Sequence, residues 1–289
     1  MIITRNLCTL TSDLYRGVRQ MRWAVALALL LLIISWGAPV AATEATEATE
    51  GLDSGQDFTL DVRKPEGEGP FPAVLLLHGC GGLSPGVVQG LSDHADALVA
   101  AGFAAVVMDS FSRRNKAGGR VCKSLEELGY ARHYRTKDAY QAQNLLASLP
   151  FVDGRNFFLI GQSNGGSVAL LLASGYNLAG RDDVVPFRGV AAFYPWCGAL
   201  TATPELVSPL LVLGAGKDDW VSPEGCRQRA VRARGAAMEV VIYEEAHHSF
   251  DLPITRQVYA GHIVEGDPEA TIDSRRRILD FFLQQLTRL

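Results

Sequence analysis

The stretch Phe157–Ala173 reads FFLIGQSNGGSVALLLA, and it decides the fold. Its first four residues suit a buried strand, and the apolar run after Gly166 suits a helix. The turn between them has the pattern Gly-x-Ser-x-Gly, with Gly161 and Gly165 on either side of Ser163. A strand-turn-helix unit with this pattern is typical of a nucleophile elbow, which exposes the serine hydroxyl and leaves the next backbone N–H free to stabilise an oxyanion.

Segments of strand and helix character alternate along most of the chain on both sides of this stretch. Strands are expected at 58–62, 71–77, 103–108, 157–160, 189–193, 210–213 and 239–243, and helices at 91–101, 137–149, 224–234 and 268–286. This order predicts one α/β domain with a mainly parallel sheet covered by helices on both faces. Ligands bind beyond the carboxyl ends of the strands in such sheets, so the loops that follow strands are expected to form the site.

Length and charge narrow the class of protein. The chain has 289 residues, of which 48% are hydrophobic, and its formal net charge is −4. This composition supplies the core of one α/β domain. It lacks the basic surface of a nucleic-acid-binding protein, so we expect no nucleic-acid partner. We also expect the protein to be a monomer.

Residues 1–42 are interpreted as an N-terminal extension and signal peptide. Arg19 and Arg22 precede an apolar run at 23–36, and the small-residue sequence Ala-Pro-Val-Ala-Ala follows it. This order is typical of a secretory signal, with cleavage expected after Ala42. The mature protein is then periplasmic or secreted, without stable insertion in a membrane.

The same apolar run leaves a second interpretation open. Its roughly 14 residues are fewer than the roughly 20 that a spanning helix needs, but an uncleaved signal would act as a membrane anchor. Met21 is an alternative start of the chain. Small, polar and acidic residues at 43–56 indicate a linker, and 57–289 is the expected catalytic domain.

Four cysteines remain once the signal is removed: Cys80, Cys122, Cys197 and Cys226. An even number in an exported chain indicates disulfides, and four cysteines allow three connectivities. Cys80 and Cys122 follow neighbouring strands, as do Cys197 and Cys226, so the pairs 80–122 and 197–226 need the least backbone displacement. No pair has metal-ligand spacing, so no zinc site is expected.

Candidate partners for Ser163 follow later strands. A serine nucleophile needs a base, and the base needs an orienting carboxylate. Asp218 and Asp219 follow one strand, and His247 and His248 follow the next. The chain order Ser, Asp, His is that of hydrolases built around a nucleophile elbow. We predict a catalytic triad of Ser163, Asp218 and His248, with Asp219 and His247 as the alternatives.

An oxyanion hole requires two backbone donors. We expect these donors to be the N–H groups of Asn164 and Cys80. His78, at the end of the preceding strand, is expected to brace the Cys80 loop through its side chain. Surface roles are expected for the remaining histidines of the mature chain, His94, His133 and His262.

Further loop residues are candidates for substrate binding. Arg113 and Arg114 follow a strand, where an arginine can hold a substrate carboxylate through two parallel hydrogen bonds. A solvated loop is the alternative interpretation. Trp196, Trp220 and Phe250 come from loops at the same edge, where they either line an apolar pocket or pack the bases of the loops.

The segment Tyr243–Phe250, which reads YEEAHHSF, resembles the region around the catalytic histidine in the dienelactone hydrolase family. The likeness extends over roughly 57–286. It implies that His248 is the base, because the family's histidine precedes a small residue and Phe. It also implies that Asp218, the first residue of an acid loop reading DDWV, is the acid. Arg113 is favoured as the arginine that binds a substrate carboxylate.

Two features differ from the best-known members of that family. Ser163 stands where those enzymes use cysteine, and His78-Gly79-Cys80 replaces a segment with a glutamate. The chain therefore resembles an exported, serine-bearing branch. The resemblance implies an α/β-hydrolase fold and a serine hydrolase that cleaves small-molecule carboxylic esters or lactones through an acyl-enzyme, with no metal or organic cofactor. The alternatives are a prolyl-oligopeptidase-like exopeptidase and a non-catalytic binding module on the same fold.

Overall fold

The computed structural model describes residues 50–52, 55–181 and 184–288. The expected signal peptide at 1–42, its cleavage site and most of the expected linker lie outside these residues. Within the described ranges, no helix has both the length and the apolar character needed to cross a membrane.

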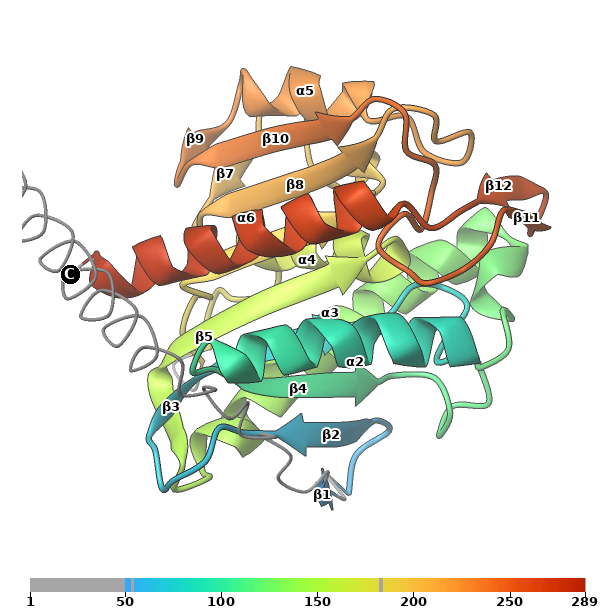
Figure 1. Cartoon of the computed structure of the whole chain (residues 1–289). Coiled ribbons are helices and arrows are strands. Elements are labelled where there is room, and N and C mark those ends of the chain that lie inside the picture. Colours follow the sequence, from blue (N-terminus) through green and yellow to red (C-terminus); the bar gives the residue numbers. More distant parts are fainter. Residues whose placement is uncertain (1–49, 53–54, 182–183, 289) are drawn as a thin grey trace, which may run out of the picture. The chain divides into compact units, whose positions relative to one another are not determined.

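An eight-stranded sheet, ordered β1-β2-β4-β3-β5-β6-β8-β10, forms the centre of the domain (Figure 1). Its strands are β1 (Glu50–Leu52), β2 (Thr59–Arg63), β3 (Phe71–Leu77), β4 (Ala104–Asp109), β5 (Val152–Gln162), β6 (Gly189–Phe193), β8 (Leu210–Ala215) and β10 (Met238–Tyr243). All pairs from β4 to β10 are parallel, whereas β2 is antiparallel to both β1 and β4. The prediction of a mainly parallel sheet is confirmed.

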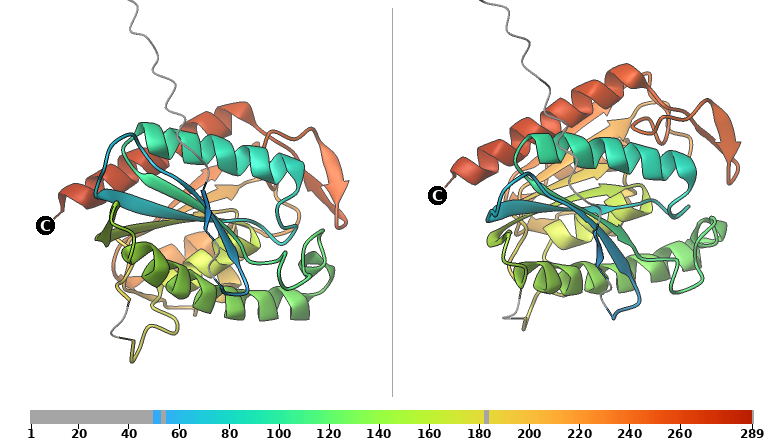
Figure 2. Two further views of the ribbon diagram at one scale, coloured as in Figure 1. Left: turned by 90° about the horizontal axis from the view of Figure 1, so that it is seen from below. Right: turned by 60° about the horizontal axis from the view of Figure 1, so that its bottom comes forward.

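Helices cover both faces of this sheet (Figures 1 and 2). One face carries α2 (Pro85–Ala100) and α6 (Pro268–Thr287), and the other carries α3 (Leu125–Ala147), α4 (Asn164–Ala173) and α5 (Glu224–Ala230). Each face has its own apolar core. Strands β4, β6 and β8 are buried along their whole length, because a parallel sheet covered on both sides leaves no face for water.

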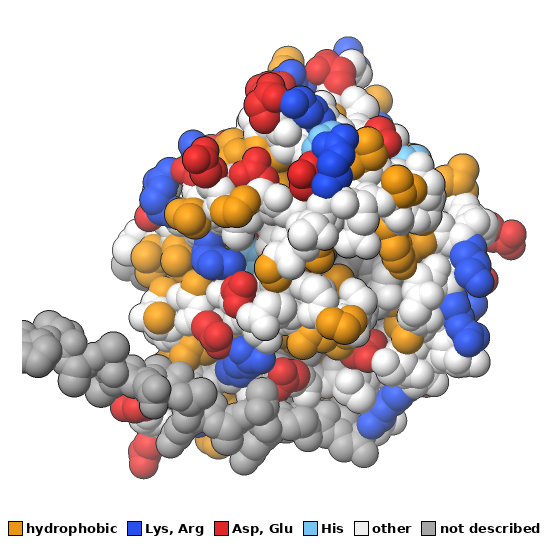
Figure 3. All heavy atoms as spheres, turned by 45° about the vertical axis from the view of Figure 1, so that its right-hand side comes forward, with side chains coloured by type: hydrophobic (Ala, Val, Ile, Leu, Met, Phe, Trp, Pro, Cys, Tyr) orange, Lys and Arg blue, Asp and Glu red, His pale blue; other side chains and the backbone are white. Residues whose placement is uncertain are grey.

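The carboxyl ends of the parallel strands lie at one edge, next to the hairpin of β11 (Gln257–Tyr259) and β12 (His262–Val264) (Figure 1). The loops at this edge also contain two short 3₁₀ helices, η1 (Val121–Lys123) and η2 (Cys197–Ala199). Lys and Arg side chains on the side shown in Figure 3 are interspersed with Asp and Glu among many uncharged groups. A separate two-stranded sheet pairs β7 (Glu205–Leu206) with β9 (Arg234–Gly235).

The structure differs from the sequence prediction at several boundaries. Helix α3 begins at Leu125, twelve residues before the predicted start at 137, because the Ser124 side chain accepts a hydrogen bond from Glu127 N and caps the helix. Helix α2 begins at Pro85 instead of 91. Strand β1 lies within the segment expected to be a linker and pairs with β2, so the sheet begins before residue 57.

Candidate active site

The turn after β5 holds Ser163 in an unusual backbone conformation. Its φ is 52° and its ψ is −112°, a strained combination for a residue with a side chain. Gly161 and Gly165 make the turn possible, because a Cβ at Gly161 would collide with the Gly165 carbonyl. A Cβ at Gly165 would lie 2.5 Å from Leu77 O. Ser163 therefore stands between strand and helix, as the sequence pattern predicts.

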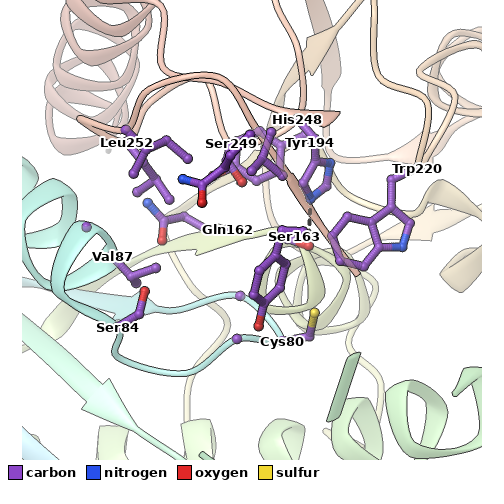
Figure 4. Close-up of a pocket in the computed structure, with 17 residues that line it drawn as sticks. Cys80, Ser84, Val87, Gln162, Ser163, Tyr194, Trp220, His248, Ser249 and Leu252 are labelled. Carbon is purple, nitrogen blue, oxygen red and sulfur yellow. Dashed lines mark hydrogen bonds between the residues drawn. The ribbon is translucent and has the colours of Figure 1, made fainter. Parts of the chain in front are cut away.

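Ser163, His248 and Asp218 form a continuous chain of hydrogen bonds. Figure 4 shows the first of these bonds, between Ser163 and His248. His248 Nε2 lies 3.0 Å from Ser163 Oγ, and His248 Nδ1 lies 2.7 Å from Asp218 Oδ2. Asp218 Oδ1 accepts hydrogen bonds from the backbone N–H groups of Trp220 and Val221, each at 2.9 Å. These bonds leave Asp218 Oδ2 directed at the imidazole, so the three predicted triad residues lie together in the order that proton transfer requires.

The two alternative triad residues point elsewhere. Asp219 accepts a hydrogen bond from Ile263 N at 3.1 Å and lies 3.7 Å from the imidazole of His262. His247 Nδ1 lies 3.0 Å from Lys217 O, and its Nε2 lies 2.9 Å from a guanidinium nitrogen of Arg256. Asp219 and His247 thus link the loops that surround the β11–β12 hairpin, and neither contacts Ser163.

The loop after β3 lies against Ser163. A Cβ at Gly79 would lie 3.3 Å from Ser163 Cβ, so this loop passes directly beside the nucleophile. His78 is fully buried and braces the loop: its Nδ1 lies 2.7 Å from Gly79 O, and its Nε2 accepts from Ser110 N at 3.3 Å. Burial lowers the pKa of His78, and the nearby Arg135 lowers it further. A neutral ring suits these contacts, because one of its nitrogens must accept.

Two disulfides join loops at this edge. Cys80 in the loop after β3 is bonded to Cys122 in η1, and Cys197 in η2 is bonded to Cys226 in α5. These are the pairs expected from the sequence. The reason also holds, because β3 lies beside β4 and β6 lies beside β8. The first disulfide fixes the loop that contains the expected oxyanion donor.

Two cavities open on either side of Ser163, each of about 300 Å³. Both are bounded by Cys80, Ser163, Tyr194, Trp220 and His248. Apolar groups make up most of both linings, and the residues that complete the first cavity include Val87, Leu252, Ile254, Tyr259 and Val264. The second is completed by Leu125, Leu128, Arg132 and Trp196. Figure 4 shows the first cavity, with Ser163 and His248 among the residues that line it. A substrate with groups on both sides of its reactive carbon would extend from Ser163 into both cavities.

The aromatic candidates divide between the cavities and the core. Trp220 borders both cavities, and Trp196 borders the second, so both side chains line a pocket. Phe250 is fully buried and packs against the rings of Phe193 and Tyr194. The sequence left two interpretations of Phe250 open, and the structure shows the second of them, packing of the loop base.

The arginines are arranged differently from the expectation. Arg113 lines neither cavity, and its guanidinium donates to Gln56 O at 2.8 Å. Arg114 forms hydrogen bonds to both carboxylate oxygens of Asp138, at 2.8 and 2.9 Å. Arg132 lines the second cavity instead, with its guanidinium carbon 4.7 Å from the centroid of Trp196. One sequence pattern could have indicated the position of Arg132. Ser124-x-x-Glu127 is typical of a helix N-terminus, and it shows that α3 begins early enough to carry Arg132 to the edge of the sheet.

A second buried cluster lies beside the base and was missed in the sequence. Asp251 is fully buried and accepts hydrogen bonds from Gln162 Nε2 at 2.7 Å and Tyr194 OH at 2.5 Å. His94 Nε2 lies 2.9 Å from the same carboxylate. The Tyr194 ring packs against the imidazole of His248, with 4.5 Å between centroids. The expectation of a surface role for His94 is therefore wrong, because α2 turns this side chain into the core.

No three His, Cys, Asp or Glu side chains in the described part of the chain are grouped as metal ligands. The chemistry available from the described residues is that of a nucleophilic hydroxyl, an imidazole base, a carboxylate and backbone donors.

A parallel sheet with a serine elbow after β5, an aspartate after β8 and a histidine after β10 defines the α/β-hydrolase fold. The chain belongs to the dienelactone hydrolase family: the model of that family of hydrolases matches residues 60–286. No curated protein matches the sequence.

Solved structures with the same fold include enzymes of this family and esterases. A dienelactone hydrolase from Anabaena variabilis is similar with a TM-score of 0.59 and 17% identity, over 83% of this chain and 97% of that one. A butyrate-bound esterase from Thermogutta terrifontis has a TM-score of 0.57 and 17% identity, over 83% of this chain and 95% of that one. At this level of identity the similarity establishes the fold.

Proposed function

We propose that this protein is a serine hydrolase that cleaves carboxylic ester or lactone bonds. The observation that carries the proposal is the hydrogen-bonded chain from Ser163 Oγ through His248 to Asp218, with Ser163 on a strained turn between two cavities. Membership of a hydrolase family supports it. The Thermogutta terrifontis esterase with the same fold has been captured with butyrate and in a form phosphorylated by paraoxon.

The geometry supports an acyl-enzyme mechanism. His248 Nε2 accepts the Ser163 proton as the serine oxygen attacks the carbonyl carbon, and Asp218 stabilises the imidazolium that forms. The N–H groups of Asn164 and Cys80 bind the oxyanion. The bond from carbon to the leaving oxygen then breaks, and that oxygen takes the proton from His248. Water, deprotonated by the same imidazole, releases the acid and regenerates Ser163.

Arg132, in place of Arg113, is the residue that we propose for binding an anionic group of the substrate. Its side chain lines the second cavity, which Ser163 also borders, and burial lowers its pKa. None of the described carboxylates forms an ion pair with it, so a substrate carboxylate would supply the missing partner. The two disulfides also favour an oxidising compartment, in agreement with the expected export.

Labelling with paraoxon and hydrolysis of short p-nitrophenyl esters test the proposed function. The wild type should gain one diethylphosphoryl group on Ser163 and turn over the esters, and Ser163→Ala should lose both properties. Absence of labelling on the wild type, or equal labelling of Ser163→Ala, would exclude a serine hydrolase. Faster cleavage of peptide anilides than of esters would instead favour a peptidase. On esters with a free carboxylate, Arg132→Ala should raise KM about tenfold or more while Arg113→Ala leaves it unchanged.

A further inference from the structure

Arg135, on α3, is a fully buried cation beside the elbow. Its guanidinium donates hydrogen bonds to His78 O at 2.7 Å, to Asn164 Oδ1 at 2.9 Å and to Ser110 Oγ at 3.3 Å. All three acceptors are neutral, and no carboxylate in the described part of the chain accepts a hydrogen bond from this guanidinium. A buried charge with only neutral partners is unusual, because transfer of an ion from water to a protein interior is costly.

Arg135 nevertheless remains charged near neutral pH. Burial lowers the pKa of Arg135 to about 10, while the nearby carboxylates of Asp138 and Asp109 act in the opposite direction. The face of Phe111 lies 4.9 Å from the guanidinium carbon and adds a favourable cation–π contact. The positive charge is therefore present throughout the neutral pH range.

The acceptors of Arg135 belong to the two segments that meet at the proposed oxyanion hole. His78 directly precedes Gly79 and Cys80, and Asn164 directly follows Ser163. The Asn164 amide also donates to Leu128 O at 3.1 Å, so its side chain is held at both ends. The guanidinium thus connects the end of β3 to the first residue of α4.

We propose that Arg135 is a positioning residue of the oxyanion hole. It sets the spacing between the backbone donors of Cys80 and Asn164, and it places a positive potential next to the carbonyl oxygen on which negative charge develops. Charge interactions are stronger in the interior than in water, so a fixed cation at this position stabilises the transition state more than the bound ester. This inference rests on the proposed ester hydrolysis.

A pair of substrates that differ in the reacting oxygen isolates this role. A thionoester carries sulfur in place of the carbonyl oxygen, and sulfur is a weak hydrogen-bond acceptor. On the oxoester, Arg135→Met should lower kcat by about 10- to 100-fold with KM within about twofold, less than the loss of a direct oxyanion donor. On the thionoester the loss should be smaller, so the ratio of the two kcat values falls about tenfold. Arg135→Lys, which keeps the charge but not the planar fork, should give an intermediate ratio.

Arg114→Met is the matched control. It also removes an arginine held against α3. This arginine is paired with the Asp138 carboxylate and donates to Ser110 O at 3.1 Å, but it contacts neither His78 nor Asn164. Its oxoester-to-thionoester ratio should equal that of the wild type. An unchanged ratio in Arg135→Met, or an equal fall in Arg114→Met, overturns the proposal.

Two further results keep the test decisive. If Arg135→Met fails to unfold cooperatively on heating, Asn164→Ala replaces it, because this variant removes an acceptor of Arg135 and keeps the backbone N–H. The same fall in the ratio is expected, and a wild-type ratio overturns the proposal. A wild type that neither reacts with paraoxon nor turns over the oxoester overturns the hydrolase function itself, before any variant is compared.

Discussion

Arg135 and Asp251 are fully buried charged side chains on opposite faces of the sheet, and both lie next to the same elbow. Arg135 is surrounded by neutral acceptors on the α3 side. Asp251 lies on the α2 side, where Gln162 and Tyr194 donate to it and His94 lies within hydrogen-bonding distance. Burial alone would raise the pKa of Asp251, but its hydrogen bonds with His94, Tyr194 and Gln162 lower it.

The difference in sign matches the charges that ester hydrolysis creates. The cation lies beside the proposed oxyanion hole, where negative charge develops. The anion is bonded to Tyr194, which packs against His248, where positive charge develops. In the proposed mechanism, each face of the sheet therefore places one buried charge beside one half of the separated charge.

The largest effect should come from the charge that touches the base directly. Asp218→Asn keeps the shape of the acid but removes its charge and favours the wrong imidazole tautomer. We expect kcat on a p-nitrophenyl ester to fall by about 10³- to 10⁴-fold with little change in KM. A loss below tenfold in steady-state kinetics would mean that Asp218 does not orient His248. The roles inferred for Arg135 and Asp251 would then also fail, because both depend on this triad.

A smaller effect on kcat is expected for a variant of Asp251, and it distinguishes the role of the α2 face of the sheet from that of the α3 face. Asp251→Asn should lower kcat by about tenfold on the oxoester and on the thionoester alike, because a charge that stabilises the imidazolium is lost while the oxyanion hole stays intact. Arg135→Met should lower kcat more on the oxoester than on the thionoester. Tyr194→Phe, which keeps the ring but not the bond to Asp251, should reproduce part of the loss seen in Asp251→Asn. Equal oxoester-to-thionoester ratios in Asp251→Asn and Arg135→Met would break the comparison.

The smallest effect concerns the free energy of unfolding, and it arises from His78, whose backbone carbonyl accepts a hydrogen bond from Arg135. The folded-state pKa of His78 is lowered from 6.5 by burial and by Arg135, so the unfolded chain binds a proton that the folded chain does not. The stability from neutral His78 is complete above pH 6.5 and is lost as the pH falls toward the folded-state value. The slope approaches about 1.4 kcal/mol per pH unit. Urea unfolding of the wild type and His78→Gln between pH 5 and 8 measures this difference, and parallel curves would contradict it.

The elbow and the order of its partners could be predicted because their signals are local. Gly161, Ser163 and Gly165 are fixed by steric contacts within a few residues, and Asp218 and His248 each follow a strand with an apolar run. The parallel sheet could be predicted for the same reason. The choice of Asp218 over Asp219 agrees with the backbone N–H groups of Trp220 and Val221 that turn Asp218 toward the base.

The residues that surround the triad could not be predicted in the same way. Arg132 and Arg135 precede residue 137, where the helix was predicted to begin, so their position on α3 at the edge of the sheet was not apparent from the sequence. His94 follows Leu91 by three residues and precedes Leu98 by four, which places it on the apolar face of α2, but its polarity suggested the surface. Its partner Asp251 lies 157 residues away, and no local pattern connects the two.

The Cys80–Cys122 disulfide acts on the unfolded chain as well as on the loop that it closes. It joins residues 42 positions apart, and such a closure removes conformational freedom from the unfolded ensemble worth about 4 kcal/mol. This contribution needs no favourable contact in the folded protein. It can therefore offset the strain at Ser163 and the cost of burying Arg135, while the charge beside the proposed oxyanion hole remains unneutralised.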